Sequence, residues 1–265
     1  MGDERMTEQA RLSQPEELTN AEGFNTQGRR RRRVRGGMVR AVVFDLDGTL
    51  IHFDIDYTAL KEEVLRALGR LGIPTSSLSP EDTLTTILDK VECYIRASGL
   101  GNEFKKEVWT EVFKTAERFE AASVNSAKPM PGATDVLAAL KERGLKIGLL
   151  THNSSVIAVN VLERFGLKRF FDAMLARDFV EDVKPNPDHL SGVLRELGVK
   201  PYETVVVGDT VFDIRCAKEL GAIAVGITTG RSLKEELEAA GADFIINSLS
   251  ELLPLISRLG RSGEQ

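Results

Sequence analysis

The residues most suited to chemistry lie at positions 44–49, which read FDLDGT. Side chains two positions apart on a strand point to the same side, so Asp45 and Asp47 can converge beyond the strand's carboxyl end. Open α/β sheets bind their ligands at that edge. Gly48 permits the sharp turn with positive φ by which the chain can leave the strand. A D-x-D-G-T pattern arises by chance roughly once in 10⁵ windows at ordinary residue frequencies, so it indicates a functional carboxylate pair rather than two acids in a turn.

Four further polar residues stand where later apolar segments end or where a helix begins: Thr151, Lys184, Asp209 and Asp213. Taken alone, each has an ordinary explanation, such as a helix cap, a surface lysine or a favourable charge in a first helical turn. Asn186 can cap a helix that Pro187 opens, and this helix start would hold Lys184 in a fixed position. Because all four occur at element ends, we interpret them as parts of one site.

Short β-branched segments alternate with amphipathic windows from residue 39 onward. Six segments are predicted as strands: 40–45, 146–151, 173–176, 204–208, 222–227 and 243–247. Five windows have helical spacing: 133–143, 154–165, 187–197, 211–220 and 233–240. Several strands are apolar on both faces, as in a parallel sheet covered by helices. The alternation predicts an α/β fold with a doubly wound, Rossmann-like parallel sheet and right-handed crossovers.

The alternation is interrupted between residues 50 and 130, where no convincing strand occurs. Apolar side chains recur there every three or four residues in three stripes, which begin at Leu60, Leu84 and Phe104. Ser79 and Pro80, followed by two acids, are typical of a helix start with a hydroxyl cap and a proline at the first position. We therefore expect an all-helical domain inserted after the first strand.

Composition excludes several classes of protein. Of the 265 residues, 42% are hydrophobic and 28% are charged, as in ordinary globular proteins. The formal net charge of −5 gives no general attraction to nucleic acid or to anionic membranes. No apolar run approaches the roughly 18 residues that a membrane-spanning helix needs. The two cysteines provide neither a disulfide framework nor a cysteine-rich metal site, so we expect a cytoplasmic protein.

The first 37 residues differ from the rest because they lack apolar periodicity and are rich in Glu, Gln, Asn, Gly and Arg. This composition is typical of a disordered tail. The tail contains an arginine run from Arg29 to Arg33, which could bind nucleic acid, although a solvated tail is the preferred interpretation. Acidic residues among the first 22 positions argue against a mitochondrial presequence.

The motifs and their order resemble the four motifs of the haloacid-dehalogenase-like (HAD) hydrolase superfamily. The matching positions are Asp45, Asp47, Thr151, Lys184, Asp209 and Asp213. The resemblance extends from residue 39 to about residue 257. The helical insertion after the first motif resembles the cap of the subfamily that contains phosphoglycolate phosphatases, β-phosphoglucomutases and phosphonatases.

This resemblance implies a mechanism with a covalent intermediate. Asp45 would be the nucleophile that forms an aspartyl-phosphate. Asp47 would be the general acid and base that protonates the leaving oxygen and then activates water. Thr151 and Lys184 would hold the transferring phosphoryl group. The groups that would hold Mg²⁺ are Asp45, the backbone carbonyl of Asp47, Asp209 and Asp213.

Electrostatics is consistent with a divalent cation. A phosphomonoester carries nearly two negative charges at neutral pH. A carboxylate about 4 Å away is repelled by on the order of 4 kcal/mol for each pair of unit charges at an effective dielectric constant of 20. Lys184 supplies one positive charge, whereas a divalent cation supplies two more. Oxygen ligands favour a hard ion such as Mg²⁺, and the three histidines are too scattered in the sequence to build a zinc site.

We therefore expect a Mg²⁺-dependent phosphatase that acts on a small phosphorylated metabolite, with phosphoglycolate as the first compound to test. Asp47 favours phosphoryl transfer because family members that dehalogenate lack an aspartate at this position. A sugar phosphomutase, which would use the same core residues, is the nearest alternative. A phosphonatase would need a reactive lysine in the cap. A non-catalytic protein, or a regulator tethered to nucleic acid by the arginine run, is an alternative of a different class.

The expected organisation has four parts. Residues 1–37 form the tail, residues 38–50 and 130–260 form the α/β core, residues 51–129 form the helical cap, and residues 261–265 form a short C-terminal tail. The two crossings at 50–54 and 128–132 are the expected hinges for opening and closing the cap.

Overall fold

The computed structural model of the protein describes residues 39–180 and 183–261. The predicted tail of residues 1–37 with its arginine run, and all but the first residue of the predicted tail 261–265, lie outside these ranges. Within them, no helix combines the length and the apolar character needed to cross a membrane.

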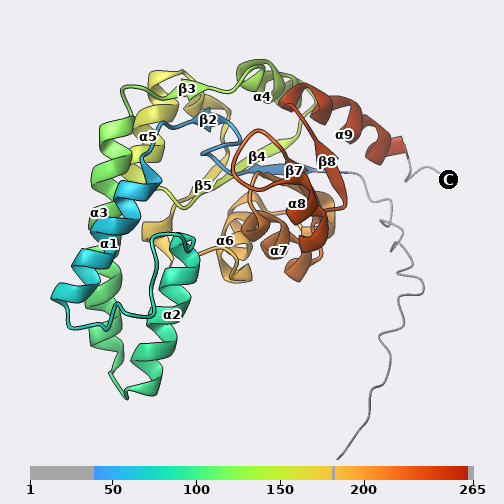
Figure 1. The fold of residues 1–265 in the computed structure, drawn as a ribbon. Coiled ribbons are helices and arrows are strands. Elements are labelled where there is room, and N and C mark those ends of the chain that lie inside the picture. Colours follow the sequence, from blue (N-terminus) through green and yellow to red (C-terminus); the bar gives the residue numbers. More distant parts are fainter. Residues whose placement is uncertain (1–38, 181–182, 262–265) are drawn as a thin grey trace, which may run out of the picture. The chain divides into compact units, whose positions relative to one another are not determined.

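A parallel sheet runs through the described chain (Figure 1). Its six strands lie in the order β5-β4-β1-β6-β7-β8. Its strands are β1 (Ala41–Phe44), β4 (Lys146–Leu150), β5 (Ala173–Leu175), β6 (Thr204–Gly208), β7 (Ile223–Ile227) and β8 (Phe244–Ile246). In register, Ala41 of β1 pairs with Lys146 of β4 on one side and with Thr204 of β6 on the other. The order of strands along the chain reverses at β1, and sheets of this kind bind their ligands at such a point.

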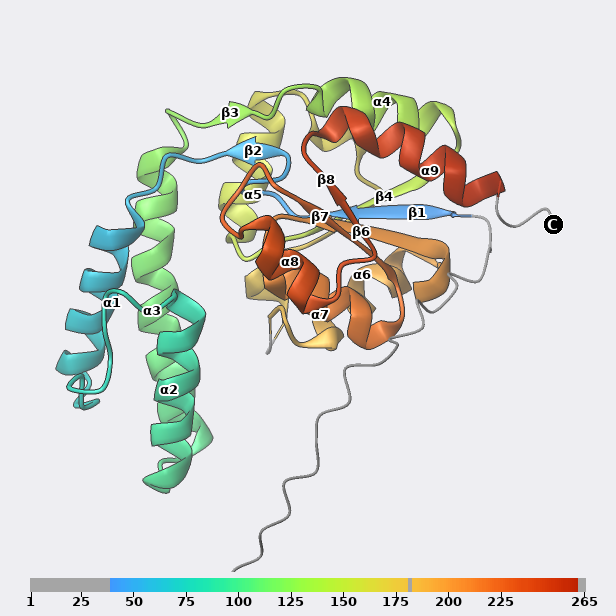
Figure 2. The same ribbon diagram turned by 45° about the vertical axis from the view of Figure 1, so that its right-hand side comes forward.

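Helices cover both faces of the sheet (Figure 2). One face packs against α4 (Ala133–Glu142), α5 (Ser155–Arg164) and α9 (Leu252–Arg261), and the other against α6 (Pro187–Leu197), α7 (Val211–Leu220) and α8 (Lys234–Ala240). Alternate side chains of β1 point to opposite faces of the sheet. Val42 and Phe44 pack in the apolar core on one face, and Ala41 and Val43 pack in the core on the other. The predicted α/β fold with a doubly wound parallel sheet is confirmed.

The predicted strands and core helices agree with the structure to within two residues at each end. Helix α9 is absent from the predicted set. Pro254 is its third residue, where the missing backbone N–H has no partner in an α-helix, so this proline does not interrupt the helix. The apolar side of α9 packs Leu252, Leu255 and Ile256 against the sheet layer.

Three helices form the inserted segment: α1 (Tyr57–Arg70), α2 (Leu84–Ala97) and α3 (Asn102–Ser123). They pack around an apolar cluster of their own, which includes Leu60 and Val64 of α1, Val91 of α2 and Val108 and Val112 of α3. Members of all three predicted stripes therefore meet in one core, which accounts for their helical spacing.

A short antiparallel ribbon connects this helical segment to the sheet. Its strands are β2 (Ile51–His52) and β3 (Lys128–Pro129), and Ile51 pairs with Pro129. Two-residue strands are too short for a periodic pattern, so the expectation that this stretch contains no strand is wrong at these positions. The limits 51–129 for a separate cap remain a prediction.

The helix start expected at Ser79 is also wrong. Helix α2 begins at Leu84, and the side chain of Thr83 caps it by accepting a hydrogen bond from the backbone N–H of Thr86. The segment before it forms a turn, in which the Asp82 backbone N–H donates to the Ser79 carbonyl over 3.1 Å and the Asp82 carboxylate accepts from the Ser79 N–H over 3.2 Å. Serine, proline and aspartate suit turns as well as helix starts, and here the turn prevails.

Candidate active site

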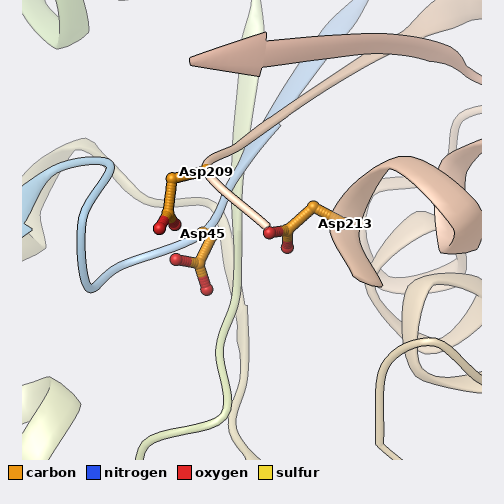
Figure 3. Close-up of side chains that lie close together, drawn as sticks. All are labelled: Asp45, Asp209 and Asp213. Atoms are coloured by element: carbon orange, nitrogen blue, oxygen red, sulfur yellow. The ribbon is translucent and has the colours of Figure 1, made fainter. Parts of the chain in front are cut away.

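Three buried aspartates meet at the carboxyl ends of β1 and β6 (Figure 3). Asp45 directly follows β1, Asp209 directly follows β6, and Asp213 lies in the first turn of α7. One carboxylate oxygen from each residue lies within 4.8 Å of the other two. Asp45 is 7% exposed and the other two are at most 1% exposed. The structure thus brings together three of the residues predicted to hold a metal ion.

Lys184 lies against this acidic cluster. Its Nζ donates to Asp45 Oδ1 and to Asp213 Oδ1, each over 2.6 Å, and to the Leu150 carbonyl over 2.9 Å. Burial opposes the positive charge, but Asp213 and Asp45 outweigh it and hold the pKa of Lys184 above its ordinary value. The lysine is therefore charged and offsets part of the negative charge of the cluster.

Lys184 does not neutralise the whole cluster, and the remaining repulsion between the carboxylates affects their pKa values. Burial, with repulsion from Asp213 and Asp209, raises the pKa of Asp45 well above its usual range, and Lys184 opposes the rise. Burial and the neighbouring Asp213 raise the pKa of Asp209 to about 6. These carboxylates are held together at an electrostatic cost that a bound cation would relieve.

The cluster fits a divalent cation. It offers only oxygen donors, which hard divalent ions prefer. The backbone also approaches closely at Gly48, where φ is +84° and a β-carbon would lie 2.6 Å from Asp209 Oδ2. A β-carbon at Gly230 would approach the same oxygen more closely still. Glycine at both positions leaves the Asp209 carboxylate room beside Asp45.

A cavity of about 1120 Å³ opens beside the cluster. The core contributes the predicted site residues Asp45, Asp47, Thr151 and Lys184 to its wall. Helices α1 and α3 contribute mostly apolar and aromatic side chains: Tyr57, Leu60, Trp109 and Phe113. A few polar groups beside apolar and aromatic side chains are typical of a small-molecule site.

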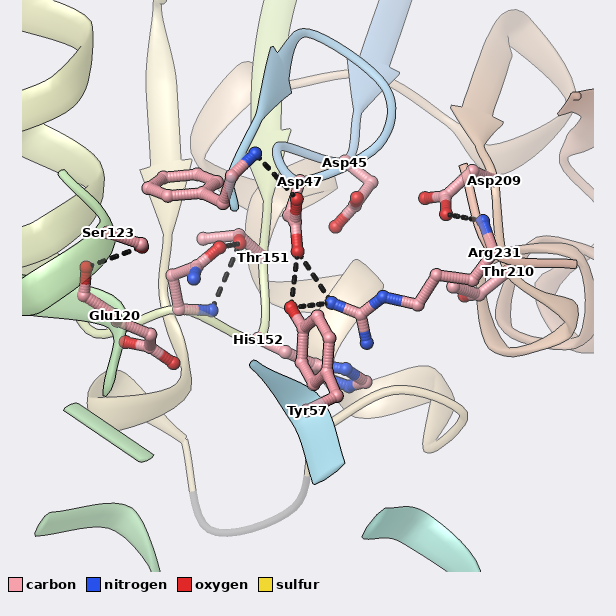
Figure 4. Close-up of polar contacts among 12 residues, drawn as sticks. Asp45, Asp47, Tyr57, Glu120, Ser123, Thr151, His152, Asp209, Thr210 and Arg231 are labelled. Carbon is pink, nitrogen blue, oxygen red and sulfur yellow. Dashed lines mark hydrogen bonds and ion pairs between the residues drawn. The ribbon is translucent and has the colours of Figure 1, made fainter. Parts of the chain in front are cut away.

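Asp47, the second aspartate of the first motif, points to a different set of partners (Figure 4). Its Oδ1 accepts from the Phe53 backbone N–H over 3.3 Å. Its Oδ2 accepts from the Tyr57 hydroxyl over 2.6 Å and from Arg231 Nη2 over 2.5 Å. Burial raises the pKa of Tyr57 far above its ordinary value, although Arg231 opposes this, so the hydroxyl remains a donor. The two aspartates of the motif therefore occupy different environments.

Residues 39–221 match the family model described as haloacid dehalogenase-like hydrolase. This match covers more than half of the chain. The chain belongs to the haloacid dehalogenase-like hydrolases. The predicted family is thereby confirmed.

Curated relatives and solved structures agree with this assignment. A phosphoglycolate phosphatase of Neisseria meningitidis is 30% identical over 218 residues, which cover 81% of this chain and 92% of the relative. One from Escherichia coli K12 is 28% identical and covers 82% and 92%. A structure named a predicted phosphatase from Clostridium acetobutylicum has a TM-score of 0.61 at 24% identity and covers 84% and 100%. With these relatives, the prediction that the chain is an enzyme of the phosphatase class is confirmed.

The same fold also occurs outside the proteins named phosphatases. A structure from Bacteroides vulgatus with the provisional name β-phosphoglucomutase has a TM-score of 0.60 at 23% identity, and the match covers 86% of this hydrolase and 91% of that chain. At this identity the likeness concerns the fold alone.

Thr151, the predicted phosphate ligand after β4, is fully buried in this hydrolase. Its hydroxyl donates to Asn153 Oδ1 over 2.9 Å and accepts from the Asn153 backbone N–H over 3.1 Å.

Two histidines bind the backbone of Lys184. His152 Nε2 donates to the Lys184 carbonyl over 3.0 Å, and His189 Nδ1 accepts from the Lys184 N–H over 3.2 Å.

A buried ion pair links α3 to the loop that carries Thr151. Arg177 pairs with Glu120 of α3 through Nη1 and also donates to the His152 carbonyl over 2.7 Å. The Glu120 carboxylate accepts a long hydrogen bond of 3.4 Å from the Ser154 backbone N–H. Burial raises the pKa of Glu120, and Arg177 opposes the rise. This pair fixes the loop relative to the helical insertion.

Several polar residues in the wall of the site were not predicted from the sequence, among them Tyr57, Glu120, Arg177 and Arg231. Arg231 had a usable signal, because it follows a predicted strand at the carboxyl edge of the sheet. Glu120 had a weaker one, as a charge next to Phe119 on an apolar stripe. Tyr57 and Arg177 belong to no motif, and only the folded chain brings them to the cavity.

Proposed function

We propose that this hydrolase is a Mg²⁺-dependent phosphatase that hydrolyses a small phosphorylated metabolite through an aspartyl-phosphate on Asp45. The observation that carries the proposal is the buried contact of Asp45 with Lys184, beside Asp209 and Asp213. A buried carboxylate with an ammonium group in contact can meet a dianionic phosphoryl group, whereas an isolated carboxylate would repel it.

The proposed reaction has two steps, and in each, one bond to phosphorus forms and another breaks. An oxygen of Asp45 attacks phosphorus, the bond to the leaving oxygen breaks, and Asp47 donates a proton to that oxygen. Water then loses a proton to Asp47 and attacks the phosphorus, which releases inorganic phosphate and restores Asp45. Lys184 and Thr151 would hold the phosphoryl oxygens during both steps. One water is consumed for each ester bond broken.

The groups proposed to hold the metal ion are Asp45, the backbone carbonyl of Asp47, Asp209 and Asp213. When bound there, Mg²⁺ would supply positive charge that offsets the carboxylates and the phosphoryl oxygens. The raised pKa of about 6 for Asp209 supports this assignment, because burial and repulsion by Asp213 disfavour its ionised carboxylate and a bound cation would favour it.

Phosphoglycolate is the first substrate to test, because curated relatives at 26–30% identity are named phosphoglycolate phosphatases. The test is a phosphate-release screen of the full chain over many phosphorylated metabolites, before and after removal of divalent cations. We expect release of inorganic phosphate that requires Mg²⁺ and is absent in Asp45→Asn. Formation of an isomer without inorganic phosphate would instead indicate a sugar phosphomutase.

Metal binding has a readout that does not depend on turnover. Mg²⁺ should raise the melting temperature of the wild-type protein, and the rise should be smaller in Asp209→Asn. An equal rise in both proteins would contradict the proposed metal site.

A further inference from the structure

Arg231 lies beside Asp47, the residue that would protonate the leaving group in the proposed function. Its Nη2 lies 2.5 Å from Asp47 Oδ2, the oxygen that also accepts from Tyr57. In the proposed function Asp47 protonates the leaving oxygen, so a group within hydrogen-bond distance of Asp47 must border the leaving group. Lys184, in contrast, contacts Asp45 and therefore borders the phosphoryl group.

The orientation of the Arg231 guanidinium is fixed by its surroundings. Its central carbon lies 3.8 Å from the centre of the Tyr57 ring, so the two groups stack. Its backbone N–H donates to Asp209 Oδ2 over 2.8 Å, which anchors the loop after β7 to the acidic cluster. A guanidinium held in place loses little conformational entropy when a ligand binds.

The same guanidinium retains donors for a ligand. Both polar contacts of the side chain, with Asp47 and with the Tyr57 hydroxyl, use Nη2. Nε and Nη1 have no hydrogen-bond partner among residues 39–180 and 183–261. The side chain is 51% exposed and lines the cavity, so these N–H groups are open to a bound molecule.

Two other cations that line the cavity are already compensated. Lys184 lies between two carboxylates, and Arg177 is buried against Glu120. Within the described part of the chain Arg231 forms an ion pair with Asp47 alone, and that carboxylate also accepts hydrogen bonds from the Tyr57 hydroxyl and the Phe53 N–H. Among Lys184, Arg177 and Arg231, Arg231 is therefore the one whose positive charge is least fully matched.

We propose that Arg231 is a specificity-determining residue that selects phosphomonoesters whose leaving group carries a carboxylate. This inference rests on the proposed phosphatase function. Guanidinium groups bind carboxylates through paired, charge-assisted hydrogen bonds. A substrate with a neutral leaving group leaves the Nε and Nη1 donors unmatched. The expected preference for the carboxylate-bearing substrate is about 10- to 100-fold in kcat/KM.

The test compares two esters of equal length, 2-phosphoglycolate and ethyl phosphate, in the wild-type protein, Arg231→Met, Arg231→Lys and Arg169→Met. Arg231→Met should lose most of the preference for 2-phosphoglycolate, and Arg231→Lys should keep part of it. Arg169→Met is the matched control, because the Arg169 guanidinium also stacks on an aromatic ring, 4.9 Å from the centre of the Phe170 ring, but Arg169 is exposed and does not line the cavity. Its ratio should equal that of the wild type.

An equal loss of kcat/KM for both esters in Arg231→Met would overturn the inference, since it would mean that Arg231 only positions Asp47. Calorimetric binding of the same two esters to the four proteins provides a second test without turnover. Tighter binding of 2-phosphoglycolate that disappears in Arg231→Met supports the inference even if neither ester is hydrolysed, in which case the proposed reaction alone fails. Binding with no difference between the two esters in the wild type overturns it.

Discussion

The Nζ atom of Lys184 lies 2.6 Å from Oδ1 of Asp45, although 139 residues separate them in the chain. The same ammonium lies 2.6 Å from Asp213 Oδ1, and all three side chains are at most 9% exposed. One lysine thus holds two buried carboxylates that would otherwise repel each other. This relationship places the predicted nucleophile beside a fixed positive charge.

Removal of that charge should impair both stability and turnover. In Lys184→Met the buried carboxylates lose their partner, and we expect the free energy of unfolding to fall by about 3–5 kcal/mol. Turnover should fall by about 10²-fold or more, because the charge that would face the phosphoryl group in the proposed reaction is lost. Urea denaturation and phosphate release measure the two effects.

Lys218→Met is the matched control for this prediction. Lys218 also forms an ion pair, with Asp243 at 2.5 Å, but its side chain is 39% exposed. An exposed pair contributes at most about 1 kcal/mol, and Lys218 does not contact Asp45, so turnover should be retained. Equal losses in the two variants would show that burial between the carboxylates gives Lys184 no special role.

The two aspartates of the first motif should differ in the severity of their loss. Asp45→Asn should abolish turnover and any covalent phosphoryl mark, because the amide does not replace the attacking carboxylate oxygen. Asp47→Asn should slow turnover by about 10²–10⁴-fold, because proton transfer is lost while the nucleophile remains. Rapid acid quench followed by intact-mass measurement detects the phosphoryl group. Asp54→Asn is the control, because Asp54 is a nearby aspartate that is exposed, and its turnover should match that of the wild type. Wild-type rates in Asp45→Asn would refute the mechanism.

The close backbone approach at Gly230 should be needed for metal binding. In Gly230→Ala the new β-carbon would overlap Asp209 Oδ2, so the carboxylate must move away from Asp45. We expect the affinity for Mg²⁺ to fall by about tenfold or more in a thermal-shift titration. Gly101→Ala is the control, since a β-carbon there has no neighbour within 4 Å among the residues that the structure describes. An unchanged Mg²⁺ titration in Gly230→Ala would argue against Asp209 as a ligand.

His189 should make the fold less stable in acid. Burial and the nearby Lys184 charge lower the pKa of His189 to about 3, far below the ordinary histidine value. Below about pH 6.5 the unfolded chain therefore binds a proton that the folded chain does not, and stability falls as the pH decreases. This residue alone should remove about 1 kcal/mol between pH 7.5 and pH 5.5.

His189→Asn isolates this contribution because the amide oxygen can still accept from the Lys184 N–H. Urea denaturation of both proteins at pH 7.5 and pH 5.5 separates the cost of the substitution itself from the cost of the proton. We expect the variant to lose less stability than the wild type between the two pH values. If both proteins lose the same stability between the two pH values, protonation of His189 in the unfolded chain does not contribute to the acid sensitivity.

Much of the site could be predicted because its residues stand at the ends of apolar strands. In a parallel sheet these ends meet at one edge, so Asp45, Thr151 and Asp209 are brought together by topology alone. The fold was predictable for the same reason, since strands buried on both faces have a distinct apolar pattern. The errors fall on short or ambiguous signals, namely the two-residue strands β2 and β3 and the turn at Ser79.

The amino-acid sequence by itself determined the alternation of strands and helices, the acidic motif and the all-oxygen character of the site, because these depend on local pattern and residue type. Only the tertiary structure decided that Tyr57 and Arg231 meet at Asp47 and that Arg177 pairs with Glu120. Such contacts join segments far apart in the chain, and no local pattern encodes them. They arise because packing of the helical insertion and of the loop after β7 brings polar side chains within hydrogen-bond distance, and those that are buried need a partner.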